Sequence, residues 1–217
     1  MFELARKKEI MATKLGSQRP YSFSFTAASL RPELLAVVAE VFLKSGSWDL
    51  AKAEVLRTNA LQCRSAASLN RLEREIRPRL QTLTRTQIEL VCHATVESRT
   101  HLGWLAAVKH SAFLFDFSAE ALRSKLEHHE TIFRLSDYRR FLDEKASQHP
   151  EHASLTETST GKVQRVVLRM IREVGILGKG SDLGTLHRPV LPSDVELAIR
   201  QDDPRWLAAF MVPDKEI

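Results

Sequence analysis

Apolar side chains recur at helical spacing along almost the whole chain, and this periodicity constrains the fold more than any other feature. Residues three and four positions apart share one face of a helix, so such a pattern predicts amphipathic helices that must pack together. Together with cap residues and breakers, it predicts helices over 30–44, 48–58, 65–80, 84–96, 99–115, 118–129, 136–148 and 160–174. The sequence therefore predicts an all-α fold.

The organisation of the predicted helices changes near residue 117. Before it, five helices predict a bundle domain over 20–117, with the alternating apolar segment 21–25 as a strand-like lead-in pinned onto the bundle. After it, helices precede a glycine-rich stretch flanked by two short apolar segments, which predict a short β-hairpin. Helices followed by a hairpin are the order of a winged helix-turn-helix. We therefore expect a winged-helix-like domain over 118–217.

Charge and cysteine usage narrow the class of protein. Lys and Arg total 32 against 27 Asp and Glu, and a net charge of +5 favours a polyanionic partner only where the cations cluster. We expect residues 1–19 to form a basic tail. Cys63 and Cys92 have neither metal-ligand spacing nor a disulfide framework, which favours a cytoplasmic protein. The most apolar stretch, 102–117, contains Lys109 and is too short to span a membrane, so we expect no membrane partner.

The helix predicted over 160–174 has the strongest functional pattern. Apolar residues occupy one arc, and the opposite arc presents four cations: Lys162, Arg165, Arg169 and Arg172. A merely solvated face would mix acids with bases, whereas Glu173 is the only carboxylate here. One helix fits the major groove of a duplex, and arginine pairs with phosphates or guanine edges. The stripe therefore predicts contact with double-stranded DNA.

Three further residues extend this predicted DNA contact. Ser159 and Thr160 stand at the start of the same helix, where hydroxyls and free backbone N–H groups bind phosphate. Lys179 lies in the glycine-rich loop of the predicted hairpin, which corresponds to the wing of a winged helix. We include all three in the candidate DNA-binding set.

A second arginine face lies on the helix predicted over 65–80. Its cations stand opposite an apolar stripe: Arg64, Arg71, Arg74 and Arg77. Glu73 and Glu75 dilute this cluster, and arginine–glutamate pairs on a helix are often weak surface ion pairs. The face is therefore either a second DNA contact or a solvated, internally paired surface.

Motifs that would indicate catalysis are missing from the sequence. Gly178-Lys179 lacks the upstream glycine and the following Ser/Thr of a P-loop, and no metalloprotease or nucleophile-elbow motif occurs. His93, Glu97 and His101 are spaced by four, but such a cluster is more often a plain surface than a metal site. The three tryptophans are expected in the core. We expect no catalytic residues, no metal, no cofactor and no enzymatic activity.

Several segments of the chain, in order and spacing, resemble the BrxA family, small components of BREX (bacteriophage exclusion) defence systems. They are Tyr21-Ser22-Phe23-Ser24, the segment 48–59, Arg71-x-x-Arg74-Glu75-Ile76-x-x-Arg79-Leu80, Asp116-Phe117, Asp137-Tyr138-x-x-Phe141, and Ser159-Thr160-x-Lys162 leading to Glu173-x-Gly175-Ile176-Leu177. The resemblance implies a two-lobed all-α fold and a DNA-binding accessory role without catalysis. It also implies a methyltransferase, a phosphatase-like protein and ATPases of the same system as partners.

The sequence thus favours a non-enzymatic protein that binds double-stranded DNA through arginine-rich helix faces. Two other functions fit the same faces. One is a protein–protein scaffold that docks other defence components, and the other is RNA binding by the N-terminal bundle.

Overall fold

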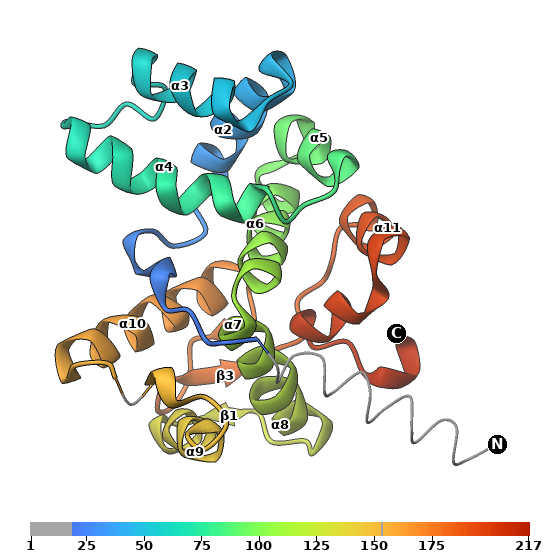
Figure 1. Ribbon diagram of the computed structural model, residues 1–217. Coiled ribbons are helices and arrows are strands. Elements are labelled where there is room, and N and C mark those ends of the chain that lie inside the picture. The colour runs from blue at the N-terminus through green and yellow to red at the C-terminus, as the bar shows by residue number, and fades with distance from the viewer. Residues whose placement is uncertain (1–18, 153) are drawn as a thin grey trace.

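Helices make up most of the chain in the computed structural model, which describes residues 19–152 and 154–217 (Figure 1). The all-α class predicted from apolar periodicity is therefore confirmed. The predicted basic tail over 1–19 lies outside the described residues, apart from Arg19.

Five helices form the upper part of the molecule in Figure 1. Their ends follow local chemistry, because Ser65, Thr84 and Thr95 each accept a backbone N–H at a helix start, and Gly46 and Asn59 adopt left-handed backbone at helix ends. The helices are α2 (Pro32–Ser45), α3 (Trp48–Thr58), α4 (Ala66–Leu80), α5 (Arg85–His93) and α6 (Val96–His110).

A run of shorter helical segments continues α6 downward through the molecule (Figure 1). It consists of α7 (Ala112–Asp116), the π-helical η2 (Phe117–Leu122) and α8 (Arg123–Glu127). Phe117 is fully buried and contacts Phe113, Phe133 and Phe141. The predicted boundary near 117 falls inside this helical run, and the division into two domains stays a prediction.

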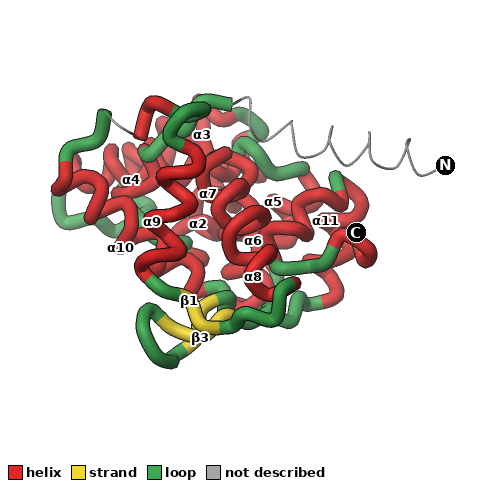
Figure 2. Tube along the Cα trace, turned by 90° about the horizontal axis from the view of Figure 1, so that it is seen from below, coloured by secondary structure: helices red, strands yellow, loops and turns green. Residues whose placement is uncertain are grey.

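The lower part of the molecule combines two helices with a small sheet. Its elements are β1 (Ile132–Phe133), α9 (Leu135–Lys145), η3 (Pro150–His152), α10 (Glu157–Glu173), β2 (Leu177–Gly178) and β3 (Gly184–Leu186). The strands are antiparallel in the order β1-β3-β2, with Phe133 opposite Gly184 and Leu177 opposite Leu186. Figure 2 shows them at one edge of the molecule. The hairpin was predicted, whereas β1 was not.

Gly184 fixes the geometry of this hairpin. Its backbone has φ +143°, and a Cβ atom there would lie 2.3 Å from the carbonyl oxygen of Gly178. Only glycine fits such a close strand approach.

The C-terminal segment returns to the upper bundle. α11 (Ser193–Asp202) packs on α5 and α6, and η4 (Pro204–Phe210) packs on α6 and η2, before the short η5 (Asp214–Glu216). The indole of Trp104 is fully buried and donates to the Ala209 carbonyl at 2.9 Å. Among the described helices, none is long and apolar enough to cross a membrane.

The predicted strand-like lead-in over 21–25 is wrong. Residues Ser24–Ala27 form a short 3-10 helix, η1, which lies between α4 and α10 (Figure 1). Buried side chains of α4, rather than a neighbouring strand, satisfy the backbone of this segment. The Glu75 carboxylate accepts the N–H groups of Ala27 and Ala28 at 2.7 and 2.8 Å.

Arg79, one turn further along α4, binds the carbonyl groups of the same segment. Its guanidinium donates to Ser29 at 2.9 Å, to Phe25 and Ala28 at 3.2 Å, and to the Glu75 carboxylate. Burial raises the pKa of Glu75 and lowers the pKa of Arg79, while their attraction opposes both shifts. We call this buried group, Glu75 with Arg79, the α4 ion pair.

A second buried polar contact ties the segment before η1 to α7. The Tyr21 hydroxyl donates to Asp116 at 2.9 Å, and the Tyr21 ring stacks on His149 with a centroid distance of 3.5 Å. Burial raises the pKa of Asp116 to about 6, and the nearby Glu120 carboxylate adds to this shift. Asp116 is therefore held ionised at neutral pH at a cost of ~3 kcal/mol.

The α4 ion pair gives a first prediction. Arg79→Met removes one buried charge, leaves Glu75 uncompensated and strips three carbonyls of their donor, so we expect the free energy of unfolding to fall by about 3–5 kcal/mol in urea titrations. Arg85→Met breaks the exposed Arg85–Glu89 pair and should cost less than about 1 kcal/mol. Equal losses in the two variants would contradict a structural role for the buried pair.

Asp116 gives a prediction about pH. Because its pKa is raised on folding, the protein gains stability from this group below pH 4 and loses it as the pH rises through about 6. Asp116→Asn keeps an acceptor for Tyr21 and removes the charge. We expect the variant to match the wild type near pH 4 and to exceed its free energy of unfolding by about 1–3 kcal/mol at pH 8. A gain of the same size at both pH values would show that the charge is not the cause.

Candidate nucleic-acid interface

Helix α10 begins three residues earlier than predicted. Thr156 caps it by accepting the Ser159 N–H at 3.2 Å, and Glu157 occupies the first turn. The Ser159 hydroxyl is hydrogen-bonded to Thr156 Oγ1 at 2.9 Å, and the Thr160 hydroxyl donates to the Thr156 carbonyl at 3.2 Å. Both predicted phosphate ligands therefore lie within the first turn rather than at the cap, with their hydroxyls in local hydrogen bonds.

The two faces of α10 separate apolar residues from cations, as their spacing predicts. Val163, Val167 and Ile171 are buried, whereas all four cations of the opposite arc are exposed: Lys162, Arg165, Arg169 and Arg172. This arrangement leaves the basic stripe facing outward along the helix.

The four cations of α10 differ in how they are engaged. Within the described part of the chain, Lys162 and Arg165 form no ion pair, and Arg165 only donates to the Gly161 carbonyl of its own helix. Arg169 lies 3.9 Å from Glu173 at the limit of an ion pair. Arg172 donates to the Leu183 carbonyl at 2.9 Å. The N-terminal half of the stripe is thus free for an anion, while Arg172 holds a loop.

That loop, residues 179–183, connects β2 to β3 and is the wing of the predicted motif; we call it the wing loop. Lys179 is exposed in it. Arg134, from the segment before α9, lies 3.4 Å from Asp182 in the same loop. The wing loop is therefore bound to the body of the protein at Leu183 and Asp182.

The glutamates of α4 do not dilute its basic face. Glu73 is buried and paired with Arg77, which makes Arg77 an internal partner rather than an open cation. Glu75 is buried in the α4 ion pair. Arg71 and Arg74 are exposed and, in residues 19–152 and 154–217, have no ion-pair partner. Arg64, in the loop before α4, has the same exposed and unpaired state.

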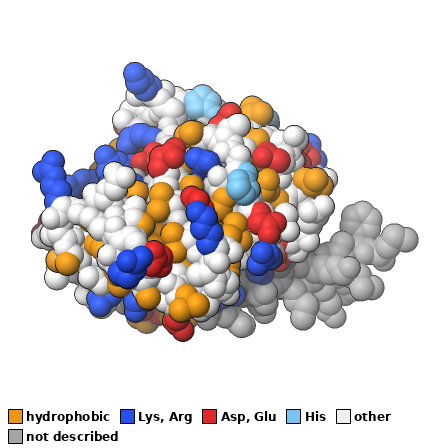
Figure 3. Space-filling model, turned by 90° about the horizontal axis from the view of Figure 1, so that it is seen from above, with side chains coloured by type: hydrophobic (Ala, Val, Ile, Leu, Met, Phe, Trp, Pro, Cys, Tyr) orange, Lys and Arg blue, Asp and Glu red, His pale blue; other side chains and the backbone are white. Residues whose placement is uncertain are grey.

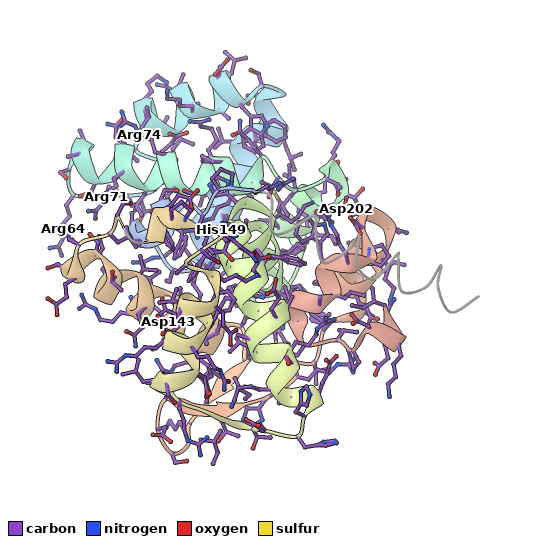
Figure 4. The ribbon with its side chains drawn as sticks, turned by 60° about the horizontal axis from the view of Figure 1, so that its bottom comes forward. Arg64, Arg71, Arg74, Asp143, His149 and Asp202 are labelled. Atoms are coloured by element: carbon purple, nitrogen blue, oxygen red, sulfur yellow. The ribbon has the colours of Figure 1, made fainter. Side chains whose placement is uncertain are left out.

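The fold brings the two basic faces together. Arg71 and Arg74 of α4 line one pocket with Lys162 of α10, although the two helices are far apart in sequence. Figure 4 shows the labelled arginines from the loop before α4 to the middle of that helix, with Arg71 on the side of α4 that faces α10. Seen from above, basic side chains gather at the left edge of the molecule, the side on which α4 begins (Figure 3). We call this surface, Arg64, Arg71, Arg74, Lys162, Arg165 and Arg169, the α4–α10 surface.

The sequence analysis assigned no function to Arg79, although its helical spacing from apolar residues indicates that it is buried. Arg79 follows Leu72 by seven positions and Ile76 by three, which places it on the buried arc of α4 rather than on the basic arc. A charged residue on a buried arc is paired or hydrogen-bonded. Its role is to position η1 beside the α4–α10 surface.

The histidines considered for metal binding do not form a cluster. Helix α5 ends at His93 and α6 begins at Val96, so His93 does not share a helix with Glu97 and His101. His101 is hydrogen-bonded through Nδ1 to the Glu97 carbonyl at 2.9 Å. No group of three or more metal-ligating side chains occurs in the residues that the structure describes.

A protein-family model matches most of the chain. The family model described as BrxA matches residues 19–203. A protein named BREX protein BrxA from Bacillus cereus (strain H3081.97) is 24% identical over 149 residues, which are 69% of this chain and 74% of that protein. A protein of the same name from Escherichia coli O9:H4 (strain HS) is 24% identical over 139 residues, or 64% of this chain and 65% of that protein.

A solved structure has the same fold. The crystal structure of an uncharacterized protein from Magnetospirillum magneticum superposes with a TM-score of 0.73 over 89% of this chain and 98% of that one, at 20% sequence identity. At this identity the similarity concerns the fold alone.

Proposed function

The chain belongs to the BrxA family, and on that premise we propose that it is a DNA-binding accessory protein of a bacterial BREX phage-defence system. Two relatives carry the name BREX protein BrxA, which supports the place in phage defence. We propose a binding role rather than a catalytic one, in the cytoplasm, where its DNA ligand would be.

The observation that carries the DNA proposal is the uncompensated charge of the α4–α10 surface. Its neighbouring acids, Glu73 and Glu75, are buried and paired inside the protein. Arg71 and Arg74 of α4 are exposed, as are Lys162 and Arg165 of α10, and these four cations form no ion pair among the described residues. Each phosphate neutralised by such a cation releases condensed counterions, and this release drives protein–DNA association.

The order of the lower elements supports a winged-helix-like mode of binding. β1, α9, α10, β2 and β3 follow α8 in sequence, and β3 lies between β1 and β2. In a winged helix, the helix before the hairpin enters the major groove and the wing touches the backbone. We assign α10 to the groove and Lys179 of the wing loop to the backbone.

A scaffold for other BREX components is the second candidate. Val96 and Leu197 are large apolar side chains more than half exposed, on α6 and α11, whose first turns are joined by a hydrogen bond between Ser98 and Asp194. Neither side chain belongs to the α4–α10 surface, although Glu97 in the first turn of α6 lines a separate pocket with Glu173 at the C-terminal end of α10. The two roles are compatible, because they use different faces. The scaffold role is tested separately by asking whether the protein pulls down other BREX proteins from a nuclease-treated lysate. Competition between duplex DNA and structured RNA tests RNA binding by the upper bundle.

The DNA proposal predicts a strong effect of reversing charge on α10. For the wild type, we expect the affinity for a labelled duplex, measured by fluorescence anisotropy, to fall about 100-fold between about 50 and 200 mM salt if four phosphates are neutralised. Arg165→Glu with Arg169→Glu should abolish binding and leave the circular dichroism spectrum and the unfolding midpoint unchanged, because both side chains are exposed.

A matched control separates local from overall charge. Lys44→Glu with Arg85→Glu changes the net charge by the same amount, at exposed positions on α2 and α5. We expect this variant to bind almost as well as the wild type. Normal binding by the α10 variant, or equal losses in both variants, would show that α10 is not the contact helix.

A further inference from the structure

A pocket of about 630 Å³ opens between η1, α4 and α10. Arg71, Arg74 and Asn70 line it from α4, Lys162 lines it from α10, and Thr26 of η1 adds a hydroxyl group. Three separate segments of the chain therefore contribute donors to one concave site. We call it the α4–α10 pocket.

The charge of the α4–α10 pocket is strongly positive. Glu75 is the one acid in its lining, and both carboxylate oxygens of Glu75 already accept the N–H groups of Ala27 and Ala28 as well as Arg79. Arg71, Arg74 and Lys162 form no ion pair among the described residues, although Arg71 lies near enough to Glu75 for its charge to lower the pKa of that carboxyl. Three cations thus share a pocket in which Glu75, the one acid among the described lining residues, already accepts hydrogen bonds from η1, Ala28 and Arg79.

The wall of this pocket is built by the α4 ion pair. Arg79 and Glu75 fix the backbone of η1 from inside, and η1 in turn contacts both α4 and α10. The wall that carries Thr26 is therefore held by buried contacts, whereas the cations of the pocket extend from the surface. Such preorganisation lowers the entropy lost when an anion binds.

We infer that the α4–α10 pocket seats one backbone phosphate of the bound DNA, held jointly by Arg71 of α4 and Lys162 of α10. This inference rests on the proposed DNA binding and identifies two side chains that would hold one phosphate of the bound DNA. Arginine offers a planar fork to phosphate oxygens and lysine a point charge, so the two side chains can occupy different oxygens of one phosphodiester. The seated phosphate would bridge the upper bundle and the lower lobe.

A shared phosphate has a consequence that separate contacts lack. If both cations hold the same phosphate, removing both loses one phosphate contact, and the slope of log affinity against log salt falls by about 0.9. If they hold two phosphates, the slope falls by about 1.8. The difference between the two cases is measurable in one salt series.

The test is a double-mutant cycle in the full chain with Arg71→Gln, Lys162→Gln and the double variant. We expect the double variant to lose less affinity than the product of the two single losses, with a slope change of about 0.9. The matched control is the cycle of Arg71→Gln with Arg165→Gln, since Arg165 does not line the pocket. There we expect the loss of affinity in the double variant to equal the product of the two single losses. If the double Arg71, Lys162 variant instead loses affinity by the product of the two single losses, with a slope change near about 1.8, the two cations do not share one phosphate. That result would overturn this inference without contradicting the proposed DNA binding.

A second measurement tests anion binding in the α4–α10 pocket independently of DNA binding. Pyrophosphate should raise the melting temperature of the wild type and have no effect on the Arg71→Gln, Lys162→Gln double variant. A wild type that binds no duplex but shows this pyrophosphate effect would overturn the DNA proposal and support the anion seat. A pyrophosphate effect of equal size in both proteins would overturn the seat.

Discussion

The buried pair of Glu75 and Arg79 is the interaction on which the rest of the arrangement depends. It satisfies the backbone of the segment around η1 from both sides, accepting its N–H groups and donating to its carbonyls. The end of α10 is tied to the same region, because the Leu30 N–H donates to Glu173 at 2.9 Å. Two helices far apart in the sequence, α4 and α10, are thereby placed beside one short segment. The cost of burying two charges is offset only because nearly every polar atom of the pair has a partner.

This buried chemistry also determines the electrostatics of the surface. A net charge of +5 is modest for a protein proposed to bind DNA. Because α4 turns Glu73 and Glu75 inward, its outer side keeps arginines without adjacent acids. The local excess of positive charge therefore arises because the glutamates of α4 are buried while its arginines are exposed. The amino-acid composition alone does not show this difference. Arg172 illustrates the opposite case, since its guanidinium holds the wing loop.

The sequence predicted long periodic elements well and contacts between elements poorly. Helix α3 has the predicted bounds of 48–58 because a serine, an apolar period and an asparagine mark it locally. β1 escaped prediction because two residues are too few for an alternating pattern. The segment at 21–25 alternates like a strand but is bound by side chains distant in sequence, since Tyr21 donates to Asp116 and the Phe25 carbonyl accepts Arg79. The basic stripe of α10 was found from spacing alone, whereas its meeting with α4 depends on tertiary structure.

Placement of DNA on the α4–α10 surface is tested most directly by site-specific photocrosslinking. A photoreactive side chain at Ala67, which lines the α4–α10 pocket, should crosslink to a labelled duplex, and excess salt should suppress the product. The same group at Leu197, exposed on α11 at the other side of the molecule, should give no crosslink (Figure 1). Crosslinking from Leu197 as strong as that from Ala67, or from Leu197 alone, would contradict DNA binding at this surface.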